Sequence, residues 1–193
     1  GFISSIATVG AMGARAKETP SLISSAVAGA TLSSLATVLQ LAMLLAAIHP
    51  PTLHALMWSL AFGGVSIAIY GLVVTLRSLH KNETDIYKPT KTFSVKTALI
   101  LAMVIAAALV ASAALKAWFG QAGLVVASGV AGVADVHAST ISVASLAAAS
   151  KLSPESAVIP ILVAFSVNSV SKAVMAVISG GKDFSYQVIL GLI

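Results

Sequence analysis

The sequence predicts an all-α fold, a polytopic bundle of transmembrane helices. Of its 193 residues, 58% are hydrophobic and only 9% are charged, and the mean hydropathy is +1.01. Soluble domains usually carry about a quarter charged residues, so this chain has too few charges to cover a surface that faces water. A lipid bilayer is therefore the expected surrounding of most of its surface.

Five apolar runs are long enough to cross a bilayer, because a spanning helix needs about 20 mostly apolar residues. These full spans cover residues 21–48, 53–76, 97–118, 122–150 and 157–179, and partial spans at both ends cover 2–14 and 184–193. Two helices are expected to begin at a proline after a capping residue, at Thr19-Pro20 and Ser153-Pro154. His49-Pro50-Pro51 and Gly180-Gly181 are expected to end helices. Residues 1–193 thus form one transmembrane domain.

The charges between the spans predict the orientation. If every run crosses once, one side receives Arg15, Lys17, Arg77, Lys81, Lys88, Lys91, Lys96 and Lys151, and the other receives Lys116 and Lys182. Eight positive charges against two is a positive-inside bias, which puts the loop 77–96 in the cytoplasm. The net charge of +5 is then explained by orientation, and nucleic acid is not an expected partner.

An acid lies near the middle of the fourth run, in VAGVADVHAST. On a continuous helix, Asp135 shares a face with small residues, half of them hydroxyls: Ser128, Ala131, Gly132, Ala138, Ser139 and Ser142. A charge at that depth costs about 3 kcal/mol or more, so Asp135 is expected to face the bundle interior and to seek a partner. Asn168 and Lys172, four residues apart on the next span, are the predicted partners.

Each of these residues also has an ordinary structural interpretation. Asp135 can be a buried acid that is hydrogen-bonded to serines, and Lys172 can extend its ammonium to the membrane interface. His137, on a more apolar face than Asp135, can be a packed core histidine instead of a ligand. These alternatives stay open at the level of the sequence.

Two stretches resemble each other and suggest an internal repeat. GFISSIATVGAMGARA at residue 1 aligns with GVADVHASTISVASLA at residue 132, which places Ser4 on Asp135 and Thr8 on Ser139. The predicted repeat halves are 1–76 and 132–193, and by the span count the two copies run in the same direction. Transporters are often built from such repeats, with interrupted helices that meet near the midplane. Ser4, Ser5 and Thr8 then join Ser139 and Asp135 at a central site.

The first full span carries small residues at every fourth position: Ser21, Ser25, Gly29, Ser33 and Thr37. Small residues at this spacing let helix backbones approach each other closely in a membrane. We interpret the row as a helix-packing face.

The motifs of common enzymes and cofactor sites are missing from the sequence. It has no cysteine, no phosphate-binding glycine loop followed by Lys-Ser/Thr, and no HExxH, so we expect neither an enzyme nor a cofactor nor a metal centre. The predicted function is a transporter or channel component for a small ion or solute, with its polar site at Asp135. The alternative is a non-transporting membrane protein that binds a partner through the basic loop 77–96. A homo-oligomer is compatible with both.

The sequence resembles a bacterial family, the conserved domain of unknown function that lies C-terminal to the MgtC/SapB domain in inner-membrane proteins. The similarity is carried by GFISSIATVGAMGARAKE, KAWFGQAGLVVASGVAGVADVHAST and VNSVSKAVMAVISGGKDF. The resemblance implies an integral inner-membrane protein without an established activity, preceded by a further membrane domain, so that the chain is expected to be a fragment. It also implies an Asp at the position of His137, which leaves Asp135 as the firmer site residue here.

Overall fold

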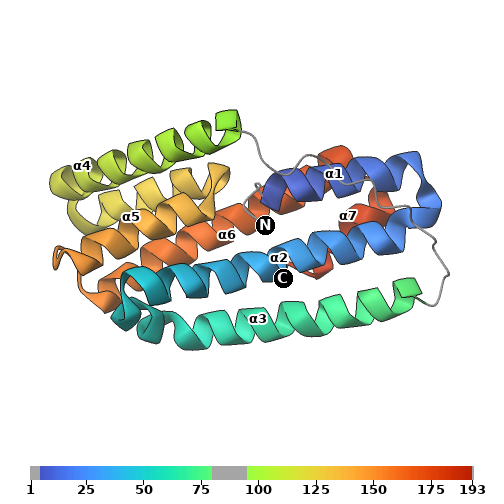
Figure 1. Ribbon diagram of the computed structural model, residues 1–193, viewed down its shortest axis with the longest axis horizontal. Helices are drawn as coiled ribbons and strands as arrows, with labels where there is room; N and C mark the ends of the chain where they lie inside the picture. Colours follow the sequence, from blue (N-terminus) through green and yellow to red (C-terminus); the bar gives the residue numbers. More distant parts are fainter. Residues whose placement is uncertain (1–4, 80–94, 193) are drawn as a thin grey trace. The chain divides into compact units, whose positions relative to one another are not determined.

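The computed structural model of the chain describes residues 5–79 and 95–192. In these two ranges the chain consists of helices joined by short turns, without strands, which confirms the predicted fold class (Figure 1). The helices are α1 (Ser5–Glu18), the short 3₁₀ helix η1 (Pro20–Leu22), α2 (Ile23–Ile48), α3 (Pro50–Leu79), α4 (Val95–Ala134), α5 (Val136–Ala148), α6 (Pro154–Ser179) and α7 (Lys182–Leu190).

The chain is a multi-pass membrane protein. Within the described residues, four stretches are long and apolar enough to cross a bilayer: Pro20–Ile48, Pro50–Arg77, Ala117–Ala134 and Pro154–Ser179. These helices turn large apolar side chains outward, among them Phe62 (71% exposed) and Ile178 (70% exposed). Such surfaces suit hydrocarbon and not water.

Proline and glycine set the helix boundaries as predicted. α6 begins at Pro154, and the hydroxyl of Ser153 accepts the N–H of Ser156 at 3.2 Å, which caps the first turn. α2 ends at Ile48, and α3 begins at Pro50 after a single linking residue. α6 ends at Ser179, directly before the predicted glycine pair.

The fold divides into two compact units. In the described residues, unit 1 holds α1, η1, α2 as far as Ala42, α3 from Met57, α6 from Asn168, and α7. Unit 2 holds the last turns of α2 from Met43, α3 as far as Leu56, α4, α5 and α6 as far as Val167.

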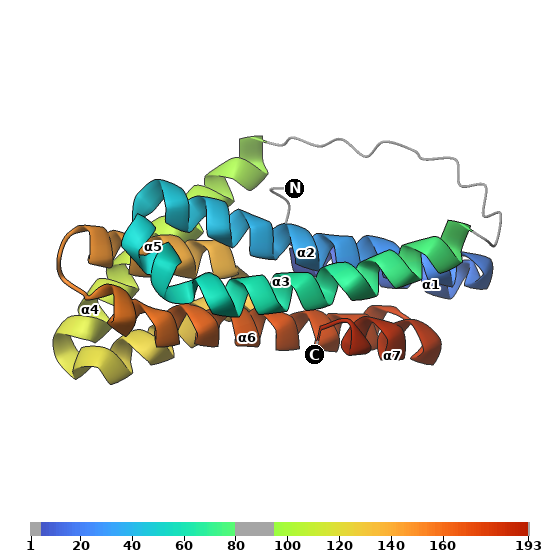
Figure 2. The ribbon, with the colours of Figure 1, turned by 90° about the horizontal axis from the view of Figure 1, so that it is seen from below.

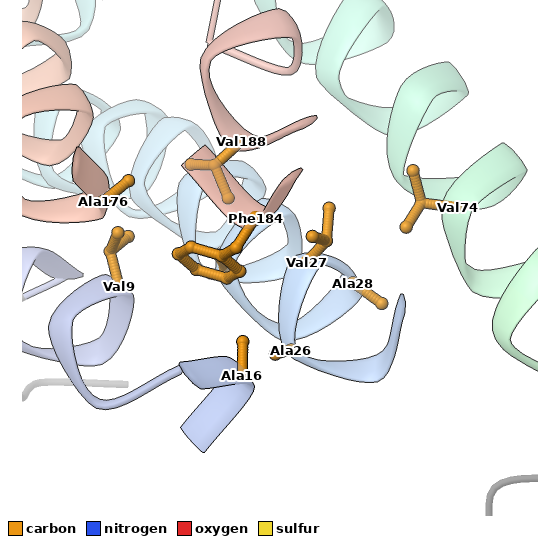
Figure 3. Close-up of a cluster of buried hydrophobic side chains, with 10 residues drawn as sticks. Val9, Ala16, Ala26, Val27, Ala28, Val74, Ala176, Phe184 and Val188 are labelled. Atoms are coloured by element: carbon orange, nitrogen blue, oxygen red, sulfur yellow. The ribbon is translucent and has the colours of Figure 1, made fainter. Parts of the chain in front are cut away.

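Unit 1 is held together by a hydrophobic cluster around Phe184 of α7. Phe184 is fully buried and lies between side chains of α1 and α2, among them Val9 and Val27 (Figure 3). The complete cluster consists of Val9, Ala16, Ala26, Val27, Ala28, Ala30, Val74, Ala176, Phe184 and Val188. Because most members are small, the backbones of these helices approach closely.

In unit 1, α3 and α6 both run antiparallel to α2. Gly64 of α3 faces Val38 and Gly71 faces Thr31, so α3 passes α2 in the opposite direction (Figure 2). On α6, Lys172 bonds to Thr37 of α2 at 3.1 Å, while Ala176, one turn later, belongs to the hydrophobic cluster that contains the earlier α2 residues 26–30. The prediction that the two sequence copies run in the same direction is therefore wrong, because α2 and α6, the helices that follow them, are antiparallel.

The predicted single span 122–150 is also wrong. The expected break before it is present, at Gly120, where a left-handed φ of 59° interrupts α4. A second break follows at Asp135, after which α5 turns back along α4. The hydroxyl of Ser139 donates to the carbonyl of Ser128 at 3.4 Å, whereas these residues would be about 16 Å apart on one straight helix. Residues 121–148 therefore form a helical hairpin, called here the hairpin, with its tip at Asp135.

The hairpin packs against the first half of α6 within unit 2. At its base, the side-chain amide of Gln121 donates to the carbonyl of Ser156 at 2.5 Å. That carbonyl is free of its usual helical donor because Pro160, four residues later, has no N–H. Near the tip, Gly132 lies so close to Ala164 that an added Cβ would stand 2.5 Å from its carbonyl oxygen.

These contacts show how deep the hairpin reaches. Ala164 is ten residues beyond Pro154, about 15 Å along a helix of about 39 Å, so the tip is level with the middle part of α6. Each arm is about 20 Å long, and the first arm is part of the stretch Ala117–Ala134 that is long and apolar enough to cross a bilayer. Because the two arms run in opposite directions, residues 121 and 148 lie at the same end of the hairpin. Lys151 and Lys182 consequently exchange sides in the predicted charge count, which stays at eight against two.

Candidate functional site

Asp135 occupies the helix break at the tip of the hairpin. Its backbone is extended, with φ −161° and ψ 118°, and it caps the N-terminus of α5. The carboxylate oxygen Oδ1 accepts the backbone N–H of His137 at 3.0 Å. Asp is a favoured residue at this position because its side chain satisfies an amide that has no partner inside the helix. The predicted helical face around Asp135 is therefore wrong, since the chain is not helical there.

The side chains of Asp135 and His137 form a close pair. His137 Nδ1 lies 2.8 Å from Asp135 Oδ1, and the two side chains are 20% and 22% exposed, respectively. If Nδ1 carries the proton and donates it to the carboxylate, Nε2 presents a lone pair. Nε2 is buried and has no hydrogen-bond partner within the described part of the chain. His137 can still be either a packed core histidine or a ligand. In both cases its hydrogen bond to Asp135 fixes the orientation of the ring.

Two hydroxyls of the hairpin share this lack of a partner. Ser128 Oγ on α4 and Thr140 Oγ1 on α5 are fully buried and make no hydrogen bond to the residues that the structure describes. Thr140 follows His137 by three residues, so the two share a side of α5. Buried polar atoms of this kind are commonly satisfied by ordered water or a bound ion.

A second polar centre lies in unit 1, between α2 and α6. Lys172 is only 1% exposed, and its ammonium donates to Thr37 Oγ1 at 3.1 Å. Asn168, one turn earlier on α6, is 2% exposed. Thr31 and Ser34 are also buried hydroxyls of α2, but each donates to a carbonyl of its own helix.

The described residues of the predicted site are divided between the two units. Asp135, His137 and Ser139 belong to unit 2, whereas Asn168 and Lys172 belong to unit 1, as do Ser5 and Thr8 on α1. Ser4 and residues 80–94 of the predicted cytoplasmic loop lie outside the described residues. The structure brings Asp135 together with His137, and Lys172 together with Thr37. The pairing of Asp135 with Lys172 stays a prediction.

Sequence reasoning missed Thr37 and Thr140 as members of the polar centres. Thr37 was visible as the last position of the small-residue row on α2, but that row predicts packing and not a lysine partner. Ser128 was predicted to share a helix face with Asp135, whereas in the structure it lies on α4 and its carbonyl accepts the hydroxyl of Ser139 on α5. No group of three or more His, Asp or Glu side chains that could hold a metal ion gathers in the described ranges.

A family comparison agrees with the sequence motifs. The family described as "Domain of unknown function (DUF4010)" matches residues 1–180. The chain belongs to the DUF4010 family. The resemblance inferred from the motifs is thereby confirmed, while a neighbouring MgtC/SapB domain stays a prediction. No curated protein and no solved structure matches the chain. The DUF4010 match covers both centres, the hairpin tip and the α2–α6 contact.

Proposed function

We propose that this DUF4010 protein transports a small ion or solute and that the hairpin tip at Asp135 is its binding point. The observation that carries the proposal is the break in the helix at Asp135, at a level where α6 is midway along its length. Ends of helices inside a membrane leave backbone groups exposed to a ligand, and transporters use such broken helices at their binding sites.

The direction of the helices supports the same conclusion. The two similar stretches precede α2 and α6, which are antiparallel in unit 1. A repeat with this arrangement is inverted, and inverted repeats with interrupted helices are typical of secondary transporters. An inverted repeat gives a protein two similar halves that open in opposite directions.

The chemistry at the tip is suited to proton coupling. A carboxylate and an imidazole that share a hydrogen bond can pass a proton to each other and to a ligand. The Asp135–His137 pair has this geometry, with 2.8 Å between Oδ1 and Nδ1, and His137 Nε2 is oriented by the bond. Two groups are too few for a magnesium cage, since Mg²⁺ prefers near-octahedral oxygen coordination.

The positive-inside bias and the family resemblance support a bacterial inner membrane, with the segment between α3 and α4 on the cytoplasmic side. This placement is part of the proposal, as is a homo-oligomer or a preceding membrane domain.

The proposal is tested by reconstituting the protein into vesicles that contain a pH-sensitive dye. Sodium, potassium, magnesium, chloride, phosphate and amino acids are added one at a time, and the internal pH is followed. We expect at least one solute to drive a pH change above that of protein-free vesicles, and Asp135→Asn to abolish it. The matched control is Asp183→Asn, an exposed acid in the first turn of α7, which should leave the response unchanged. A response that Asp135→Asn retains in full contradicts the proposal.

A further inference from the structure

We infer that Lys172 forms a binding site for a small anion in unit 1. The site lies between α2 and α6, and its protein contacts are known: the ammonium is bonded to Thr37 Oγ1 at 3.1 Å, and the side chain is 99% buried, as its exposure is 1%. A charged group so deeply buried in a membrane protein is a functional position by default, and it requires a partner.

The side chain of Lys172 keeps its ammonium inside unit 1. Ala176, one turn later on α6, belongs to the hydrophobic cluster that also contains residues 26–30 of α2, so the C-terminal end of α6 lies near the N-terminal end of that helix. The ammonium bonds to Thr37, farther along α2, and the side chain is only 1% exposed. Lys172 therefore differs from an interfacial lysine, which extends its ammonium to water.

The protein supplies no negative charge to this ammonium within the described part of unit 1. The acids there are Glu18 and Asp183, both exposed near helix ends, and neither forms an ion pair with Lys172. Removing a charge from water costs several kcal/mol unless an opposite charge and hydrogen bonds compensate it. A neutral hydroxyl alone is a poor compensation.

The hydrogen bonds of Thr37 define what is missing. Its hydroxyl donates to the carbonyl of Ser33 at 3.0 Å, so its oxygen only accepts from Lys172. A lysine ammonium has three N–H groups, and Thr37 takes one of them. The groups that remain require acceptors, and a negatively charged acceptor satisfies the hydrogen bonds and the charge at once.

The burial of the site limits the size of the anion. With Lys172 at 1% and Asn168 at 2% exposure, a halide, a carboxylate group or an inorganic oxyanion fits this chemistry, whereas a polyanion does not. That such an anion is also the transported solute, or a part of it, rests on the proposed function. The binding site itself does not.

The test is the thermal unfolding of the detergent-solubilised protein in the presence of chloride, acetate or phosphate. Ionic strength is held constant with potassium HEPES, whose bulky anion should not fit. We expect one of the three anions to raise the unfolding temperature in a saturable way, by roughly 3–6 °C at about ten times its Kd. The three salts show whether the site prefers a halide, a carboxylate or a phosphate.

The variants connect the effect to the lysine. Lys172→Met should remove the anion-dependent rise, whereas Lys172→Arg, which keeps the charge, should retain part of it. Lys151→Met is the matched control, because Lys151 is exposed, and it should behave like the wild type. The inference is overturned if none of the anions stabilises the wild type, or if Lys172→Met shows the same rise.

The two proposals can fail separately. Asp135→Asn should lose solute-driven proton movement and keep the anion-dependent rise in unfolding temperature. If the wild type moves no protons but is stabilised through Lys172, the transport proposal fails and the anion site stands. If the reverse is found, the anion site fails alone.

Discussion

The contact between Gly132 and α6 provides a sharp test of the hairpin. An alanine at this position places a Cβ 2.5 Å from the carbonyl oxygen of Ala164, 2.8 Å from its Cα and 3.0 Å from its carbonyl carbon. All three atoms belong to the backbone, so no side chain can rotate away, and the helices must separate. Overpacking usually lowers the free energy of unfolding by about 1–3 kcal/mol. A clash with backbone atoms is expected to cost an amount near the upper end of this range.

The net effect follows from two opposing terms. Alanine is a better helix former than glycine by about 1 kcal/mol, which leaves a net destabilisation of about 2 kcal/mol for Gly132→Ala. In a protein of this length, about 2 kcal/mol lowers the unfolding temperature by roughly 4–8 °C. The matched control is Gly63→Ala in α3, where an added Cβ meets no atom within 4 Å. It should leave the unfolding temperature unchanged or raise it by roughly 2–4 °C.

The assay is thermal unfolding followed by the fluorescence of Trp58 and Trp118. All variants are heated at one scan rate in one detergent, because unfolding of such proteins is commonly irreversible and then depends on the rate. If Gly132→Ala unfolds at or above the temperature of the wild type while Gly63→Ala behaves as expected, the close packing of the hairpin on α6 is refuted.

Three further predictions concern the topology, the cap and the core. The chain has no cysteine, so single variants Arg77→Cys, Lys151→Cys and Lys182→Cys can be labelled with a membrane-impermeant maleimide in oriented vesicles. The first and third should react from one side and Lys151→Cys from the other, as the hairpin requires. Asp135→Ala should lower the unfolding temperature by roughly 2–4 °C, because losing an N-cap costs about 1 kcal/mol, whereas Asp135→Asn should be near the wild type in stability. Phe184→Ala should cost about 3–5 kcal/mol, measured as a fall of roughly 6–20 °C.

Each of these has a result that would count against it. Labelling of Lys151→Cys from the same side as Arg77→Cys would restore a single span over 122–150. Equal stability of the alanine and asparagine variants at Asp135 would mean that the cap is unimportant. Tyr186→Ala, in the same helix as Phe184 but exposed, should have little effect, and an equal loss there would point to a general disturbance of α7.

The fold class was predictable because it depends on composition and run length alone. The helix boundaries at Pro154, Ile48 and Ser179 were predictable too, since proline and glycine act on their own neighbours. The reversal at Asp135 was less accessible, because an acid among small residues can lie on a helix face or cap a new helix. The length of the run was a signal: residues 122–150 would form a helix of about 43 Å, well beyond the ~30 Å that a crossing requires.

The charge bias could not reveal this error. Moving the hairpin to one side transfers Lys151 in one direction and Lys182 in the other, so the bias is the same in both topologies. The Lys172–Thr37 bond could not be predicted from the sequence either. The two residues are 135 positions apart, and their contact depends on the register of two antiparallel helices. Local rules of capping carry no information about such a register.

The hairpin is held at both of its ends, which limits how it can move. The proline in α6 releases a backbone oxygen that Gln121 takes at the base, and the glycine near the tip admits the α6 backbone. A loop fastened only at its base could swing open like a flap. The hairpin contacts α6 at both its base and its tip. A movement that changes access to Asp135 is therefore expected to displace the hairpin and the first half of α6 together as a rigid body.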